Sequence, residues 1–349
     1  MDPWYLDNLV CPLDGLPLSY RDASLVSQAG RKYPVVDGVP VMLVTEAEQT
    51  IGVANSSLAR ARGDSSGIDG RAPNLYLESL GISDAEKEGL VQLARNGRSG
   101  IDPVVAYMIG ATSGLTYKHL IGTLKEYPIP ELRLPDSEGA LLLDLGCNWG
   151  RWSIAAARKG YRVTGIDPSV GAIMAARRVA RQLDLPIKYV VADARYLPFK
   201  DTSFGFVFSY SVLQHLSKAN VITVLSQIRR VLRPDGMSLI QMPNWLGVRC
   251  LYHQARRNFR EARNFEVRYW SLRALKRAFE ENIGPSDISV DCYFGLGLQK
   301  SDKHLMPPLF RFAIRLSERL RSISQNFGTL KSFADSVYVA SVKPSERSA

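Results

Sequence analysis

One stretch decides the fold: residues 141–150 read Leu-Leu-Leu-Asp-Leu-Gly-Cys-Asn-Trp-Gly. A short apolar run followed at once by glycines is typical of a buried strand that turns sharply into a helix. Glycine permits such a turn and a close approach of the backbone to a ligand, because a Cβ atom would collide there. The stretch therefore predicts a strand, a ligand-facing turn, and a helix at residues 154–159.

Strands and helices continue to alternate after this turn. We expect strands at 162–167, 187–192, 204–209 and 237–241, helices through 174–181 and 221–232, and closing strands at 288–298 and 336–342. Alternation at this spacing predicts an α/β fold with a mostly parallel, seven-stranded sheet and helices on both faces.

The residues before this region form a different pattern. Residues 1–45 predict a small β-rich domain, with two short strands around the Asp37-Gly38 turn. Residues 46–137 predict a connector. Its segment 52–73 lacks periodicity and favours a mobile linker, Ser83-Asp84-Ala85-Glu86 has the form of a capping box, and one or two helices are expected between residues 102 and 126. We therefore expect the main domain at 138–344.

Composition sets limits on the class of protein. The chain has 349 residues, of which 46% are hydrophobic and 22% charged, so it is neither disordered nor membrane-spanning. Forty-four lysines and arginines against 34 acidic residues give a net charge of +10, which suggests an anionic partner without naming it. Arginines concentrate in an insertion at 244–283, where the alternative is a solvated helix face. A basic amphipathic helix at 306–327 could lie on an anionic membrane or dock on its own domain.

The cysteines and the N-terminus indicate the compartment. Cys11, Cys147, Cys250 and Cys292 are far apart and form no C-x-x-C pair, so neither a disulfide framework nor a metal site is expected. The acidic start is unlike a secretory signal, and no run of about 18 apolar residues occurs. We expect a cytoplasmic protein that could touch the inner face of a membrane only peripherally.

Two carboxylates occupy matching places after the first two predicted strands. Asp167 follows Asp144 by 23 positions and ends the second strand, where a carboxylate can accept hydrogen bonds from both ribose hydroxyls of an adenosine. The dinucleotide form G-x-G-x-x-G is absent, because Asn148 stands where the second glycine would be. These residues alone leave a dinucleotide enzyme and a nucleoside-cofactor enzyme both open.

The remaining motifs of this region separate the two. They are Leu143-Asp144-Leu145-Gly146-Cys147-x-x-Gly150, Gly165-Ile166-Asp167-Pro168-Ser169, Asp193-Ala194 with Leu197-Pro198-Phe199, Ser211-Val212-Leu213-Gln214-His215-Leu216, and Val231-Leu232-Arg233-Pro234-Asp235-Gly236. In order and spacing the sequence resembles the class I S-adenosylmethionine-dependent methyltransferases, especially the branch of ubiquinone and menaquinone biosynthesis. The resemblance implies a Rossmann-like fold and S-adenosylmethionine as cofactor.

The resemblance also assigns cofactor contacts. It implies that Asp144, Gly146 and Gly150 lie at the methionine part, and that Asp167 holds the ribose. Cys147 belongs to the same cofactor loop, where it is expected to pack under the loop and not to react. It further implies that Asp193 accepts from the adenine amino group, with the Ala194 amide facing the adjacent ring nitrogen.

The acceptor side is less specific. His215 is the candidate base for an acceptor that must lose a proton, with structural packing as the alternative, and Tyr210 and Gln214 are candidates for the same wall. Arg256 and Arg257 of the insertion favour an anionic acceptor: a small molecule, a lipid-linked molecule or a glycan.

Two other functions stay open. One is an RNA methyltransferase, although residues 208–211 lack the Asn/Asp-Pro-Pro-Tyr/Phe motif of base-amine enzymes. The other is a non-catalytic scaffold, which the intact carboxylates and glycines argue against.

The first domain carries a second resemblance. Residues 6–13 and 33–43 resemble a small zinc-ribbon-like domain known as the activating subunit of several methyltransferases. Asp14 stands where metal-binding members have a cysteine, and no other cysteine precedes Cys147. The domain is therefore expected to lack metal ligands and to act as a packing module, and its kinship raises the RNA hypothesis a little.

Overall fold

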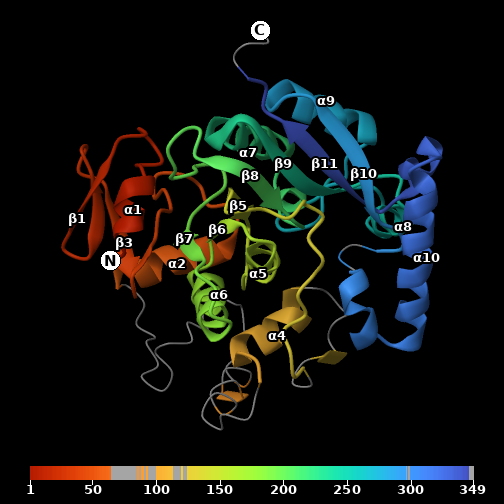
Figure 1. The fold of residues 1–349 in the computed structure, drawn as a ribbon, viewed down its shortest axis with the longest axis horizontal. Coiled ribbons are helices and arrows are strands. Elements are labelled where there is room, and N and C mark those ends of the chain that lie inside the picture. The colour runs from red at the N-terminus through yellow and green to blue at the C-terminus, as the bar shows by residue number, and fades with distance from the viewer. Residues whose placement is uncertain are drawn as a thin grey trace. The chain divides into compact units, whose positions relative to one another are not determined.

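The computed structural model describes residues 1–63, 85, 88–89, 92, 100–112, 119–120, 124–295, 297 and 299–345 (Figure 1). The chain divides into two compact units: residues 1–129 with 146–200, and residues 130–145 with 201–349. We call them unit 1 and unit 2 and describe each by itself. The domain boundaries expected from the sequence, at residues 45 and 137, stay a prediction.

The main sheet has seven strands in the order β10-β11-β9-β8-β5-β6-β7. Its strands are β5 (Leu141–Leu145), β6 (Arg162–Asp167), β7 (Lys188–Val191), β8 (Phe204–Ser209), β9 (Leu232–Pro243), β10 (Ser286–Cys292) and β11 (Ser336–Val342). Strand β8 pairs in parallel with β5 and β9, and β6 with β7, whereas β11 is antiparallel to both β9 and β10. The α/β fold predicted from the sequence is confirmed.

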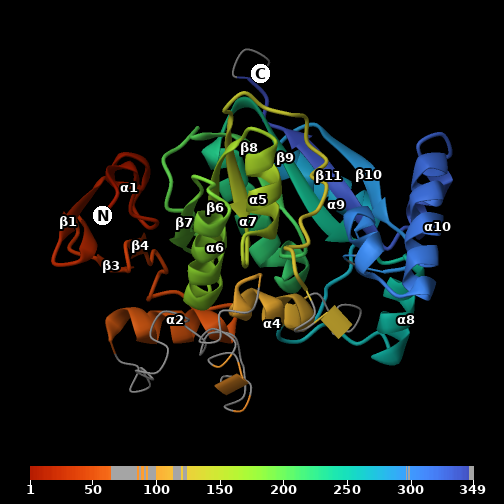
Figure 2. The ribbon, with the colours of Figure 1, turned by 60° about the horizontal axis from the view of Figure 1, so that its bottom comes forward.

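Helices follow the strands as the alternation predicted. They are α1 (Pro3–Asn8), α2 (Gly52–Arg62), α4 (Pro103–Thr112), α5 (Arg151–Arg158), α6 (Val170–Gln182), α7 (Lys218–Val231), α8 (Val248–Arg256), α9 (Leu272–Asn282) and α10 (Pro308–Ser324), with 3-10 helices η3 (Leu213–His215), η4 (Lys300–Leu305) and η5 (Gly328–Phe333). Three of them begin where a serine hydroxyl accepts a backbone N–H three residues on: Ser169, Ser217 and Ser271. In unit 2, α7 and α9 pack on each other, and α10 packs on β10 (Figure 2).

The N-terminal part of unit 1 is a four-stranded antiparallel sheet of β1 (Leu18–Arg21), β2 (Ser24–Ser27), β3 (Lys32–Val36) and β4 (Val39–Pro40). Asp37 and Gly38 both have positive φ, at 47° and 80°, so the predicted hairpin turn is confirmed. The segment after β4 then reaches the main sheet, where the Met42 N–H donates to the Val191 carbonyl at 2.7 Å. Strand β7 is the edge of that sheet, so this contact covers unpaired backbone there.

One hydrophobic core joins this small sheet to the helices of unit 1. Val39, Val41 and Leu43 pack with side chains of α6 and β7, and with Cys147 of the loop after β5. The small sheet is therefore built into the interior of unit 1 and contributes to its stability through buried apolar area.

The segment expected to be a linker is in part a helix. Residues 52–62 form α2, because Ala54 and Ser57 are buried against the core of unit 1. Small side chains bury little area each, so the apolar stripe was too weak to read from the sequence. The predicted capping box at 83–86 falls almost wholly outside the described residues. In the connector, α4 begins after Asp102, whose carboxylate accepts from the N–H groups of Val104 and Val105.

Other boundaries differ by a few residues. Strand β10 ends at Cys292, six residues before the predicted end, after a register shift between Val290 and Cys292. Strand β9 begins at Leu232, five residues before the start predicted at 237. Within the described part of the chain, no helix is both long and apolar enough to cross a bilayer.

Candidate functional site

The loop after β5 has a left-handed backbone conformation at three positions, which favours glycine and asparagine. Gly146, Asn148 and Gly150 all have positive φ, at 77°, 50° and 84°. The N–H groups of Gly146 and Cys147 both donate to the Ile166 carbonyl, at 2.8 and 2.9 Å, which ties the loop to the end of β6. A Cβ atom at Gly150 would lie 2.6 Å from the Tyr189 hydroxyl. The loop therefore requires glycine at this position for its packing as well as for its conformation.

Asp167 ends β6 beside this loop. Its Oδ1 accepts from the Ser169 N–H at 2.9 Å, and its Oδ2 accepts from the Asn148 N–H at 3.1 Å. Each carboxylate oxygen can accept a second hydrogen bond, so both remain able to receive a hydroxyl. Burial raises the pKa of Asp167 to about 6, although the two N–H donors pull it down. This geometry suits a ligand with two neighbouring hydroxyl groups.

Asp193 and Ala194 follow β7 in the same unit, but the Asp193 carboxylate already has a partner. The Arg195 Nε lies 3.2 and 3.1 Å from its two oxygens, and Arg195 Nη2 lies 2.7 Å from Oδ2. The backbone N–H of Arg195 donates to Oδ1 at 2.8 Å. Arg195 was not singled out from the sequence. The signal available in the sequence was its position, two residues after Asp193.

Two other residues expected at the cofactor, Cys147 and Asp144, lie in different units. Cys147 is buried and packs in the core of unit 1, with its Sγ 3.7 Å from the Asn148 carbonyl. Asp144 is buried in β5, which belongs to unit 2. The structure therefore brings Gly146, Gly150 and Asp167 together around one turn.

His215, in η3 of unit 2, has both ring nitrogens engaged. Its Nδ1 lies 2.7 Å from the Phe265 carbonyl, so Nδ1 carries the proton and Nε2 holds the lone pair. The Gln214 Nε2 lies 3.2 Å from the His215 Nε2, and the imidazole stacks on the Phe265 ring with 3.8 Å between the ring centroids. Burial lowers the pKa of His215, and nearby Arg268 lowers it further, so the ring is neutral at pH 7.

Tyr210 lies at the carboxyl end of β8 and binds a buried carboxylate. Its hydroxyl donates to Asp291 Oδ2 at 2.8 Å and accepts from Gln299 Nε2 at 2.6 Å. Burial and the Asp291 charge raise the pKa of Tyr210 well above its usual value. Arg133 Nη1, 3.5 Å from Asp291 Oδ1, supplies the counter-charge. Sequence reasoning missed Asp291, because Asp287 of the same strand is exposed and nothing in the sequence marks Asp291 as the buried one.

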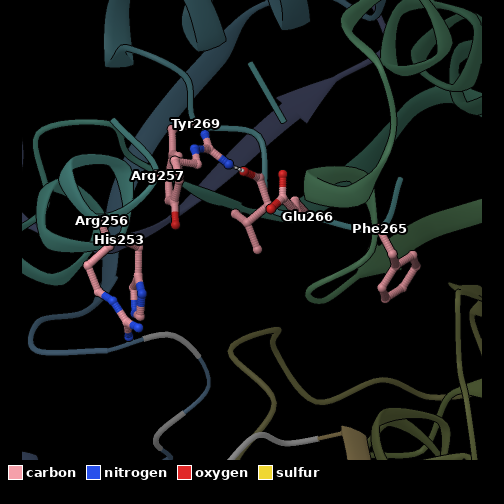
Figure 3. Close-up of a pocket in the computed structure, with 7 residues that line it drawn as sticks. His253, Arg256, Arg257, Phe265, Glu266 and Tyr269 are labelled. Carbon is pink, nitrogen blue, oxygen red and sulfur yellow. Dashed lines mark hydrogen bonds between the residues drawn. The ribbon is translucent and has the colours of Figure 1, made fainter. Parts of the chain in front are cut away.

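Arg256 and Arg257 line a pocket of about 430 Å³ in unit 2 (Figure 3). Arg257 donates to the Val267 carbonyl at 3.0 Å and lies over the Tyr269 ring at 5.2 Å. Arg256 and His253 point together, away from Arg257, as Figure 3 shows. The pocket also includes Phe265, the residue that stacks on His215. The pocket and His215 are therefore neighbours within one unit.

Comparison with known proteins finds similarity over the central part of the chain. Residues 142–236 match the family model described as a methyltransferase domain. The chain is 28% identical over 145 residues to an uncharacterized methyltransferase of Synechocystis sp., a match covering 40% of this chain and 66% of that protein. It is 33% identical over 100 residues to the ubiquinone biosynthesis O-methyltransferase of Agrobacterium fabrum, covering 29% of this chain and 39% of that protein.

Among solved structures, the YcgJ protein of Bacillus subtilis is similar with a TM-score of 0.42 and 19% identity, over 60% of this chain and 93% of that one. The chain spans less than two thirds of the length of the two curated relatives. Residues 142–236 therefore carry a methyltransferase domain of the S-adenosylmethionine-dependent class I.

Proposed function

We propose that the whole protein is an S-adenosylmethionine-dependent methyltransferase whose acceptor is an anionic small molecule, free or linked to a lipid or glycan. The observation that carries this proposal is Asp167, held by two backbone N–H groups beside the glycine loop inside the methyltransferase domain. Loop 146–150 would take the methionine part, Asp167 the ribose hydroxyls, and the Ala194 amide the adenine edge. Asp193 would accept from the adenine amino group after one of its hydrogen bonds to the Arg195 guanidinium breaks.

The chemistry needs little beyond alignment. When bound, S-adenosylmethionine supplies a methyl group on a positively charged sulfur. The protein orients the acceptor in line with it and excludes water, which is most of the catalysis such transfers require. For a hydroxyl acceptor, His215 Nε2 receives the proton after releasing its bond to the Gln214 amide, while Nδ1–H stays on the Phe265 carbonyl.

The acceptor is proposed to be anionic because of the pocket in unit 2. Arg256 makes no ion pair among the described residues, and His253 lies beside it. A guanidinium with its donors unpaired suits a phosphate or carboxylate group. Tyr210 and Gln214 would form the wall next to His215. The Agrobacterium relative is named as an O-methyltransferase of ubiquinone biosynthesis.

The small N-terminal sheet is proposed to be a zinc-ribbon-like module that has lost its metal ligands. Its single cysteine, Cys11, is buried with its Sγ 3.3 Å from the Tyr33 hydroxyl. A cytoplasmic location with peripheral membrane contact completes the proposal.

Calorimetric titration with S-adenosylmethionine tests the cofactor site. We expect Asp167→Asn to weaken binding by about tenfold or more, since a hydrogen bond to a charged group is worth about 1.5–3 kcal/mol. Asp184→Asn, at an exposed carboxylate of the same unit, is the matched control and should bind like the wild type. Equal affinity of both variants would remove Asp167 from the site, and no binding to the wild type would overturn the proposed function.

A further inference from the structure

The segment from Trp245 to Phe265 in unit 2, which we call the α8 segment, exposes unusually many large apolar side chains. Of 18 such side chains exposed among the described residues, seven lie in this segment. They are Trp245, Leu246, Val248, Leu251, Tyr252, Phe259 and Phe265. Trp245 is 49% exposed, Tyr252 55% and Phe259 67%. A concentration of exposed apolar side chains in one segment of a folded protein indicates an interaction site.

Helix α8 exposes its large apolar side chains to solvent. Its apolar residues Val248, Leu251 and Tyr252 recur at helical spacing and face outward. The opposite face is buried and holds Cys250 and Gln254, whose amide donates to the carbonyls of Trp245 and Cys250. A helix that docked its apolar face on its own unit would show the reverse arrangement. The described part of the chain therefore leaves the side chains of Val248, Leu251 and Tyr252 uncovered.

The way the helix is anchored explains its orientation. Asp335 Oδ1 accepts from the N–H groups of Arg249 and Cys250, at 2.7 and 2.9 Å. Just before the helix, the Asn244 side chain donates to the carbonyls of Ser332 and Ala334. These bonds fix the backbone of the first turn against the unit with Cys250 inward, which leaves Val248 and Leu251 exposed.

The α8 segment that carries these apolar side chains is also basic. Residues 245–265 contain five arginines and one glutamate. Arg249, Arg256 and Arg263 are exposed and make no ion pair among the described residues. Helix α10, which lies near α8 in both ribbon views, exposes Leu309 and Phe312 and adds further exposed arginines (Figures 1 and 2).

We propose that the α8 segment docks this protein on an anionic lipid bilayer. Aromatic and aliphatic side chains enter the boundary between headgroups and acyl chains, while the arginines reach the lipid phosphates. A second copy of the chain fits less well, because a symmetric contact would bring two basic surfaces together. Nucleic acid offers no apolar partner for Leu246, Val248 and Leu251. The proposal deepens the peripheral membrane contact of the proposed function, and the segment shares Arg256 and Phe265 with the pocket proposed for the acceptor. Vesicle binding can be measured without methyl transfer, so the two proposals can fail separately.

Vesicle sedimentation tests the surface with the full chain. The protein should sediment with vesicles of phosphatidylcholine and phosphatidylglycerol, and at least about tenfold less with phosphatidylcholine alone. The variant Trp245→Ser, Val248→Ser, Leu251→Ser should lose about tenfold or more of this binding. The control Leu13→Ser, Ile222→Ser, Val342→Ser changes three apolar side chains exposed elsewhere and should keep it.

A spectroscopic readout covers the case in which the triple variant does not fold. Of the five tryptophans, Trp245 is the most exposed, at 49%, so its emission should shift to shorter wavelength on anionic vesicles. Trp245→Phe should still bind and lose the shift. The proposal is overturned if the wild type ignores anionic vesicles, if the folded triple variant binds like the control, or if bound protein shows no shift. Self-association abolished by the triple variant, without vesicle binding, would assign the surface to a second copy.

Discussion

Asp167 shows how one residue combines a structural and a binding role. Its carboxylate holds the turn through the N–H groups of Asn148 and Ser169, and it keeps acceptor capacity for a ligand. Its place after a strand was visible in the sequence. Its raised pKa was not, because burial depends on what the rest of unit 1 packs around it.

Cofactor affinity should depend on the protonation of Asp167. The pKa of its carboxyl is raised to about 6 by burial, so the apo protein gains stability from this group at low pH and loses it as the pH rises through about 6. Ribose hydroxyls donate best to the ionised form. We expect affinity for S-adenosylmethionine to fall below about pH 6 in calorimetry from pH 5 to 8. Asp167→Asn should bind weakly at every pH, and a flat wild-type profile would contradict the prediction.

Two variants of His215 distinguish a catalytic base from a residue that only packs. His215→Phe keeps the stacking on Phe265 and removes both ring nitrogens. If Nε2 accepts a proton, kcat should fall by about 10²–10⁴ in both His215→Phe and His215→Ala, with cofactor affinity unchanged. Activity retained by His215→Phe and lost by His215→Ala would show that the ring only packs. Steady-state kinetics with calorimetry as the control measures this.

Asp193 illustrates the limit of reasoning by position. Its place after β7 agreed with the motif, but the Arg195 guanidinium occupies both carboxylate oxygens. Side-chain pairing across two positions depends on rotamers that the motif does not encode. The same holds for Tyr210 and Asp291, which are 81 positions apart in the chain.

At the level of elements, regular periodicity was the reliable signal. Helix α7 buries Val221, Val224, Leu225 and Ile228 at helical spacing, and its existence was predicted. Helix α2 has no such stripe and was expected to be linker. It exists because Ser57 is buried and its hydroxyl accepts from the Val170 N–H at 2.9 Å, at the start of α6.

This contact makes α2 a cap for another helix. Ser57→Ala would leave the Val170 N–H buried without that partner, and the free energy of unfolding should fall by about 1–2 kcal/mol. Ser56→Ala, on the neighbouring partly buried position, is the control and should change it by less than about 0.5 kcal/mol. Urea unfolding followed by circular dichroism measures both. Equal stability of the two variants would refute the capping role.

Helices α8 and α10 show a different limit. Both were recognised as basic segments, and the sequence predicted an amphipathic helix at 306–327. In the structure Ile314 and Ser317 are buried, whereas Leu309, Phe312 and Ile323 are exposed. Amphipathicity reports that two faces differ, but only packing decides which face turns inward.

For the whole molecule, the net charge of +10 is unevenly placed. The α8 segment concentrates unpaired arginines around apolar side chains, whereas elsewhere many charges form ion pairs such as Arg178 with Asp102 at 2.6 Å. The N-terminal sheet is equally unlike an appendage, since Val41 pairs with Val191 and shares its core. The sequence predicted a small domain at residues 1–45 that acts as a packing module, and its boundary stays a prediction.

The sequence by itself determined the α/β class, the glycine turn, and Asp167 at the end of a strand. These depend on local periodicity and on backbone conformations that few residues adopt. Only the tertiary structure decided the partner of Asp193, the buried Asp291, the helix at residues 52–62 and the outward stripe of α8. These depend on contacts between residues far apart in the chain, and the free energy of such contacts comes from burial and pairing that no single segment contains.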